Sequence, residues 1–232
     1  MGGRFLPLPP AHSSIHRSRA PTRRIVVWAA VVTVLGLAAL LASERTGSTA
    51  RLVAKPVASA GFIAVAVAAG ALDTGFGRWM LAALVLSALG DVFLLGSSEA
   101  RFLGGLGSFL TAHLVYGIAF LVRGVAAPGL LAIVPFAIFA RLVLRWLGPH
   151  LSDRMRGPDV AYAVVISVMG VLAVATATDV WDWRIPVGAV MFVISDLAVA
   201  RDNFVAPGFT NRLWGLPLYY GGQLLLAWAA GA

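Results

Sequence analysis

The stretch "LVLSALGDVFLLG", residues Leu84–Gly96, decides the fold class and also raises the question of function. Apart from Asp91, it holds only apolar, small or weakly polar residues. Such a run is typical of a helix that crosses a lipid bilayer, where an ionisable side chain is costly and is retained mainly for function. A second run, "GAVMFVISDLAVA" (Gly188–Ala200), repeats the pattern with Asp196 as its single carboxylate. The two aspartates are therefore the first candidates for a functional site.

The rest of the chain is equally apolar. Its 232 residues are 59% hydrophobic and 12% charged, which is too apolar a balance for a soluble domain of this length. Two segments with one Asp each, Trp79–Leu95 and Ile185–Ala200, approach the length of about 20 residues that spans a bilayer. Six further runs contain no Asp, Glu, Lys or Arg: Ile25–Ser43, Pro56–Leu72, Phe102–Leu121, Gly124–Ala140, Val160–Thr178 and Leu213–Ala232. The sequence predicts an all-α integral membrane bundle of eight transmembrane helices over residues 25–232.

Residues 1–24 have a different composition, rich in Arg, Gly, Pro, Ser and His. We expect a disordered basic N-terminal tail that sets topology or is weakly attracted to anionic lipid. No folded basic face with interleaved aromatic residues follows it, so we expect no nucleic-acid partner. The chain has no cysteine, which excludes disulfides, thiol catalysis and thiolate metal sites.

The two aspartate-bearing segments suggest an internal repeat. Asp91 is followed 22 residues later by His113, and Asp196 is followed 24 residues later by Tyr220. The predicted helices that carry them are four spans apart, so the halves would be two parallel four-helix repeats related by an axis near the membrane normal. Chance similarity is the alternative. The Lys and Arg residues leave the membrane orientation open, because the tail favours one orientation and the short loops the other.

The predicted antiparallel helices place a set of polar residues at one end of the bundle. An aspartate that faces lipid is costly, so Asp91 and Asp196 should face an internal cavity, and we take them as the catalytic candidates. The substrate-binding candidates are Lys55, Ser87, His113, Tyr116, Ser195, Tyr219, Tyr220 and Gln223. Each candidate also has a structural interpretation: a snorkelling lysine, interfacial tyrosines, a core histidine, a glutamine that bridges helices.

Two buried carboxylates can divide acid and base roles, with one protonated while the other is ionised. A pair that flanks a scissile bond suits a reaction through an oxocarbenium ion. From the residues alone, an intramembrane acid–base hydrolase and a proton-coupled carrier of a lipid or small amphipath both stay open. A metal-dependent hydrolase that also uses His113 ranks lower, because no second histidine lies nearby in the pattern.

An ordered set of motifs carries a family resemblance. The motifs are Lys55-Pro56, "SALGDVFLL", "RFLGGLGSFLTAHLVY", "AYAVVISVMG", "GAVMFVISDLAVA", and Tyr219 or Tyr220 followed by Gln223. With these motifs the chain resembles the YhhN family of membrane proteins, which includes the lysoplasmalogenases of animals, over roughly residues 50–230.

The resemblance implies hydrolysis of the vinyl ether bond of a lysoplasmalogen to a fatty aldehyde and a glycerophospho-base, using Asp91 and Asp196. It implies a lysophospholipid substrate, surrounding membrane lipid as partner, and no metal or organic cofactor. In this interpretation Lys55 and nearby arginines bind the headgroup phosphate, and water or the glycerol is oriented by His113, Tyr116, Tyr220 and Gln223. Hydrolysis of another lysolipid is the closest alternative. We expect a multi-pass protein of the bacterial cell membrane, with homo-oligomerisation left open.

Overall fold

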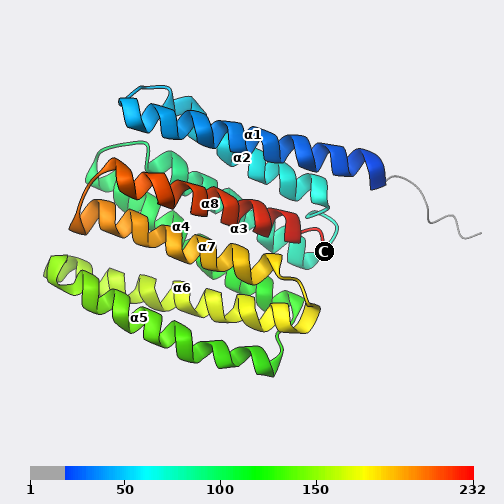
Figure 1. Cartoon of the computed structure of the whole chain (residues 1–232). Helices are drawn as coiled ribbons and strands as arrows, with labels where there is room; N and C mark the ends of the chain where they lie inside the picture. The colour runs from blue at the N-terminus through cyan, green and yellow to red at the C-terminus, as the bar shows by residue number, and fades with distance from the viewer. Residues whose placement is uncertain (1–18) are drawn as a thin grey trace, which may run out of the picture.

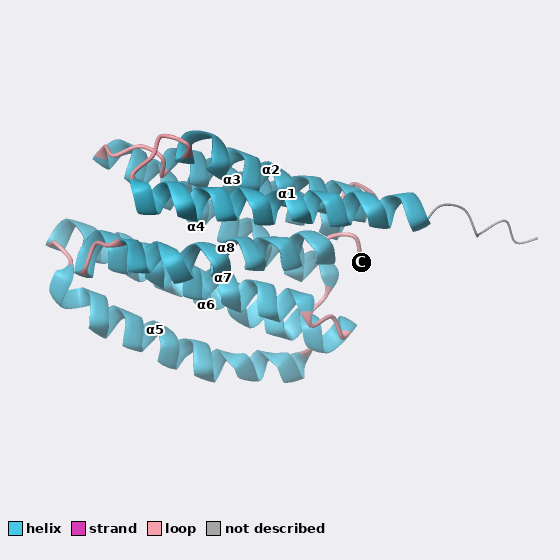
Figure 2. Cartoon of the chain, turned by 45° about the horizontal axis from the view of Figure 1, so that its top comes forward, coloured by secondary structure: helices cyan, strands magenta, loops and turns pink. Residues whose placement is uncertain are grey.

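Eight α-helices lie side by side in the computed structural model, which describes residues 19–232 (Figure 1). They are α1 (Arg19–Thr46), α2 (Arg51–Ala69), α3 (Gly75–Phe93), α4 (Glu99–Arg123), α5 (Ile133–Leu147), α6 (Asp153–Val180), α7 (Arg184–Ala200) and α8 (Phe209–Ala229). Short 3₁₀ turns at Ala127–Ala132 and Gly148–His150 flank α5, and a π-helical turn at Arg201–Val205 extends α7. Within the described residues there is no strand, so the all-α fold is confirmed (Figure 2).

The helices extend beyond the uncharged runs from which they were predicted. α2 begins at Arg51 rather than at Pro56, and α5 continues to Leu147 through Arg141 and Arg145. Uncharged runs mark the depth of the lipid hydrocarbon, whereas a helix can continue into the headgroup region, where Arg and Lys extend their charges to water. The sequence therefore located the helices but placed several of their ends too early or too late.

The outer surface identifies the chain as a multi-pass membrane protein. Six of the helical segments in residues 19–232 are long and apolar enough to cross a bilayer: Arg23–Thr46, Arg51–Ala69, Gly75–Phe93, Glu99–Arg123, Ala127–His150 and Met155–Val180. Large apolar side chains face outward, including Trp28, Leu131 and Val134, as contact with lipid requires. α7 has 17 residues, and α8 carries Asn211, Arg212 and Gln223. The count of eight spans therefore stays a prediction.

The predicted N-terminal tail lies mostly outside the described residues. Residues 1–18 are not described, and α1 begins at Arg19, before the predicted boundary at Arg24. Whether the preceding residues form a basic tail stays a prediction.

The contacts between helices follow the arrangement that two parallel repeats predict. α3 packs closely on α4, and α7 packs in the same way on α8; α2 packs on α3 as α6 does on α7. Across the middle of the bundle α2 contacts α8, and α6 contacts α4. Helices α1–α4 thus have largely the same neighbours as α5–α8. The exceptions are that α5 packs less extensively on α6 than α1 does on α2, and that α1 packs on α8 whereas α5 makes no comparable contact with α4. This partial correspondence agrees with the predicted repeat, in which Asp91 on α3 and Asp196 on α7 occupy equivalent positions.

Glycines bring α7 and α8 into close contact. A Cβ atom at Gly188 would lie 2.9 Å from the carbonyl oxygen of Gly222, and a Cβ atom at Gly222 would lie 2.7 Å from that of Gly188. Small residues allow backbones of membrane helices to approach in this way. The contact fixes α7, which carries Asp196, against α8, which carries Tyr220.

Candidate active site

Asp91 lies in the last turn of α3 and holds a buried ion pair. Its Oδ1 atom is 3.2 Å from the Lys55 Nζ atom of α2. The Ser59 hydroxyl donates a hydrogen bond of 2.7 Å to Oδ2, and the Tyr220 hydroxyl lies 3.4 Å from the same oxygen. The Asp91 residue is only 2% exposed. A buried carboxylate needs both a partner charge and hydrogen-bond donors, and Asp91 has both.

The residue before this aspartate, Gly90, has to be small because an aromatic ring of α4 packs against it. A Cβ atom at Gly90 would lie 2.8 Å from the ring of Phe109 on α4. The glycine therefore admits the Phe109 ring directly beside Asp91. That ring also packs edge to face against Phe192 and Tyr219, with centroids 6.1 Å and 5.7 Å away. These aromatic side chains form an apolar wall next to the carboxylate.

Asp196 lies near the end of α7 in a different environment. The Tyr162 hydroxyl of α6 donates a hydrogen bond of 3.0 Å to its Oδ2 atom. The His113 Nε2 atom of α4 is 3.4 Å from the same oxygen. Among the side chains that the structure describes, no Lys or Arg forms an ion pair with Asp196. The immediate polar neighbours of Asp196 are therefore a tyrosine and a histidine, whereas Asp91 is paired with a lysine.

The orientation of His113 defines where a proton can reside. Its Nδ1 atom is 2.7 Å from the Phe109 carbonyl oxygen, and its ring stacks on Phe192 with centroids 4.2 Å apart. A carbonyl only accepts hydrogen bonds, so Nδ1 carries the proton and Nε2 faces Asp196. If Asp196 were ionised and Nε2 carried no proton, lone pairs on the two atoms would face each other and repel. One further proton, held by either atom, turns this contact into an attraction.

Both aspartates line one cavity at the end of the bundle where α1, α3, α5 and α7 finish. This cavity, which we call the vestibule, has a volume of about 550 Å³. The charged side chains on its wall include Glu44, Arg51, Glu99, Asp202 and Arg212 as well as Lys55, Asp91 and Asp196. The vestibule is therefore a polar entrance to the buried carboxylate of Asp91 and the largely buried carboxylate of Asp196.

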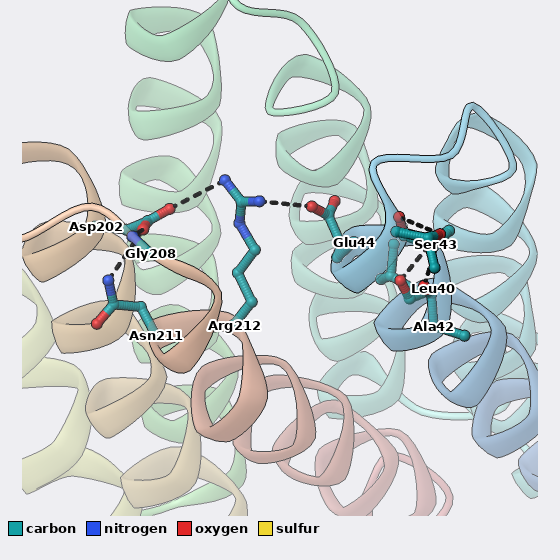
Figure 3. A network of polar contacts seen from close by, with 9 residues as sticks. Leu40, Ala42, Ser43, Glu44, Asp202, Gly208, Asn211 and Arg212 are labelled. Carbon is teal, nitrogen blue, oxygen red and sulfur yellow. Dashed lines mark hydrogen bonds and ion pairs between the residues drawn. The ribbon is translucent and has the colours of Figure 1, made fainter.

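Arg212 connects two carboxylates at the edge of the vestibule (Figure 3). Its guanidinium donates to Glu44 at the end of α1 at 2.7 Å and to Asp202 in the π-helical turn at 3.3 Å. Asp202 also accepts hydrogen bonds from the Gly208 backbone N–H at 2.7 Å and the Asn211 side chain at 3.0 Å. This network connects α1, the end of α7 and the start of α8 around the entrance.

Most of the residues predicted for the site meet at or beside the vestibule. Ser195 and Tyr219 are on its wall, although the Ser195 hydroxyl donates to the Phe192 carbonyl oxygen at 2.6 Å. The Tyr219 hydroxyl is buried and has no hydrogen-bond partner among the described residues. Tyr219 thus offers an unused donor beside the two carboxylates.

Three predicted residues lie elsewhere. The Tyr116 hydroxyl donates to the Gln223 Oε1 atom at 2.6 Å, and the Gln223 Nε2 atom is 3.4 Å from the Ser87 Oγ atom. All three are fully buried, and none lines the vestibule. They connect α4, α8 and α3 one helical turn deeper than Asp91. Gln223 therefore bridges helices, as the structural interpretation of this residue expects.

Sequence reasoning missed two residues that contact the aspartates, Ser59 and Tyr162. Ser59 follows Lys55 by four residues, a spacing that places both on one helix face, and this signal was available. Tyr162 stands in a run without charges, where a tyrosine is equally typical of the membrane interface. Within the described residues, no group of three or more His, Cys, Asp or Glu side chains lies close enough to hold a metal ion.

The fold and site together define a multi-pass membrane protein with a buried and a largely buried aspartate on a shared cavity. The family model described as the YhhN family matches residues 50–230. The chain belongs to this family.

The curated relatives carry one activity in their names. Bovine "Lysoplasmalogenase TMEM86A" is 32% identical over 153 residues, 63% of this chain and 62% of the relative. Human "Lysoplasmalogenase TMEM86B" is 34% identical over 67% of this chain and 65% of the relative. "Lysoplasmalogenase" of Mycobacterium bovis is 31% identical over 84% of this chain and 75% of the relative. The matches thus cover slightly less than two thirds of these mammalian relatives. No solved structure matches the chain.

Proposed function

We propose that the protein is an intramembrane hydrolase that cleaves the vinyl ether bond of lysoplasmalogens into a fatty aldehyde and a glycerophospho-base. The observation that carries the proposal is the pair of aspartates on one cavity, Asp91 buried and Asp196 largely buried, each in a different electrostatic environment. The names of the relatives support the substrate class. A vinyl ether is cleaved through an oxocarbenium ion, which an acid generates and an anion stabilises.

Asp91 is assigned as the anion. The Lys55 ammonium pairs with its carboxylate, and the hydroxyls of Ser59 and Tyr220 lie within hydrogen-bond distance of Oδ2. In this role the Asp91 carboxylate stabilises the positive charge that develops on the substrate and activates the attacking water.

Asp196 is assigned as the acid. The proton required between Asp196 and His113 is available for donation, and no ammonium or guanidinium pairs with the carboxyl in the described residues. Tyr162 donates to Oδ2 and so stabilises the carboxylate that remains once the proton has left.

The reaction then balances in three steps. Asp196 protonates the vinyl carbon remote from the ether oxygen, which leaves an oxocarbenium ion at the carbon bonded to that oxygen. Water adds to this carbon with loss of a proton to Asp91, giving a hemiacetal. The hemiacetal then breaks its carbon–oxygen bond to the glycerol: Asp91 gives its proton to the departing glycerol oxygen, and the hemiacetal hydroxyl gives its proton to Asp196. This yields the fatty aldehyde and the alcohol and returns both carboxyl groups to their starting protonation states.

Arg51 is the better candidate for binding the headgroup phosphate. The sequence prediction gave this role to Lys55 and nearby arginines, but the Lys55 charge is taken up by Asp91, and Arg212 is held between two carboxylates. Arg51 lines the vestibule and forms no ion pair among the described residues. A guanidinium suits a phosphate because it donates two parallel hydrogen bonds.

The proposal is tested by aldehyde release from 1-alkenyl-lysophosphoethanolamine by purified protein in detergent. The wild type should release aldehyde, and Asp91→Asn and Asp196→Asn should each abolish turnover while remaining folded. Asp153→Asn is the matched control, because this carboxylate is 93% exposed on the same end of the bundle. A folded wild type that releases no aldehyde contradicts the proposal, and a carrier would instead move the lipid without cleaving it.

A further inference from the structure

A second cavity lies on the other side of Asp196. This side pocket has a volume of about 50 Å³ and lies among α4, α5, α6 and α7. Its wall is mostly apolar and includes Leu106, Val143, Leu147, Met155, Ala163 and Ile166. Asp159 is the other carboxylate on this wall, one helical turn before Ala163 and thus closer to the end of the bundle where α6 begins.

The side pocket and the vestibule meet at Asp196. Asp196, Phe102 and Phe109 line both cavities. Asp91 and Lys55 line the vestibule and are not on the wall of the side pocket. The carboxyl assigned as the acid thus stands at the boundary between a polar and an apolar compartment.

The two compartments differ in polarity. The charged wall of the vestibule includes Glu44, Arg51 and Lys55 of α1 and α2, together with charged residues of α4, α8 and the π-helical turn. The wall of the side pocket is mostly apolar, with Leu147 of α5 and Met155 of α6 among its residues, and its polar groups are Asp159, Tyr162 and Asp196. The bundle therefore provides one compartment that suits an ionic group and one that suits hydrocarbon.

We propose that the side pocket binds the first carbon atoms of the hydrocarbon chain of a lysolipid while its headgroup occupies the vestibule. This inference rests on the proposed function. In a lysoplasmalogen the vinyl ether stands between the polar glycerophospho-base and the chain, so this orientation sets the reacting carbons against Asp196. The small volume of the pocket fits the beginning of a chain rather than a whole one, and its apolar wall replaces water around those carbons.

Filling the pocket tests the orientation. Ala163 is 2% exposed and lines the pocket, so Ala163→Phe inserts a ring where the chain would lie. The probes are non-cleavable 1-O-hexadecyl-lysophosphoethanolamine and glycerophosphoethanolamine, which has no chain. Ala163→Phe should raise the Kd of the hexadecyl probe about tenfold, the equivalent of excluding roughly two methylene groups. The Kd of the chain-free probe should not change.

Two further variants keep the result interpretable. Val160→Phe makes a similar enlargement three residues earlier on α6, at a side chain that is 47% exposed and lines neither cavity, and should leave both Kd values unchanged. Met155→Trp replaces Ala163→Phe if the latter does not fold, because Met155 is only partly buried on the pocket wall.

An unchanged Kd for the hexadecyl probe in a folded pocket variant would overturn the inference, as would equal weakening of both probes. Because neither probe is cleaved, the result does not depend on turnover. Failure of the proposed hydrolysis is thereby distinguished from failure of the chain site.

Discussion

The ion pair between Lys55 and Asp91 gives a quantitative prediction for stability. Lys55→Met keeps the length of the side chain but removes the ammonium 3.2 Å from the carboxylate. Removing one partner of a buried ion pair costs about 3–5 kcal/mol of unfolding free energy. We expect about 3 kcal/mol, the lower end of that range, because Ser59 and Tyr220 still donate to Asp91.

For a chain of this length, 1 kcal/mol corresponds to about 2–4 °C in Tm. Lys55→Met should therefore lower Tm by about 6–12 °C, measured by fluorescence during heating in one detergent. The double variant Lys55→Met/Asp91→Leu should recover most of the loss, since no unpaired charge then remains. A single variant within 2 °C of wild type, or a double variant as unstable as the single one, would refute the assigned ion pair.

Two further perturbations test the surroundings of the site and one loop. Tyr162→Phe removes the donor to Asp196 and should lower kcat for vinyl ether cleavage about tenfold or more without unfolding the protein; an unchanged kcat would contradict its assigned role. Burial alone would raise the pKa of Asp182, in the loop between α6 and α7, but the hydrogen bonds and charge of Arg184 hold that pKa below its usual value. Asp182 therefore contributes stability above the usual aspartate pKa, and this contribution is lost as pH falls through its lowered folded-state pKa. Asp182→Asn should accordingly lower Tm at neutral pH and leave it unchanged at acid pH, and a deficit that persists in acid would show that the ionised form is not responsible.

The helices were predictable because the bilayer sets their length. A run such as Ile25–Ser43 has few alternatives to a membrane helix, so length and composition are sufficient. The ends were harder to predict, because Arg141 and Arg145 can continue a helix into the headgroup region as readily as they can end it.

The sequence was sufficient to predict the depth of the candidate site residues in the membrane, but not which side chains contact one another. Antiparallel connections of short loops place Asp91 and Asp196 at one end of the bundle without any knowledge of packing. The partners of each carboxylate depend on how each helix is rotated about its axis, which a single apolar sequence does not specify. For that reason Lys55 was expected at a phosphate and Gln223 at the substrate, whereas Lys55 pairs with Asp91 and Gln223 with Tyr116.

The most direct test of the central claim is aldehyde release by the wild type and by Asp91→Asn and Asp196→Asn, with folding verified for each protein. We predict turnover of 1-alkenyl-lysophosphoethanolamine by the wild type and by the exposed control Asp153→Asn, and none by either site variant. Turnover that persists in a folded Asp196→Asn protein would contradict the assignment of Asp196 as the acid. A wild type that binds the lipid but leaves the vinyl ether intact would contradict the hydrolase itself.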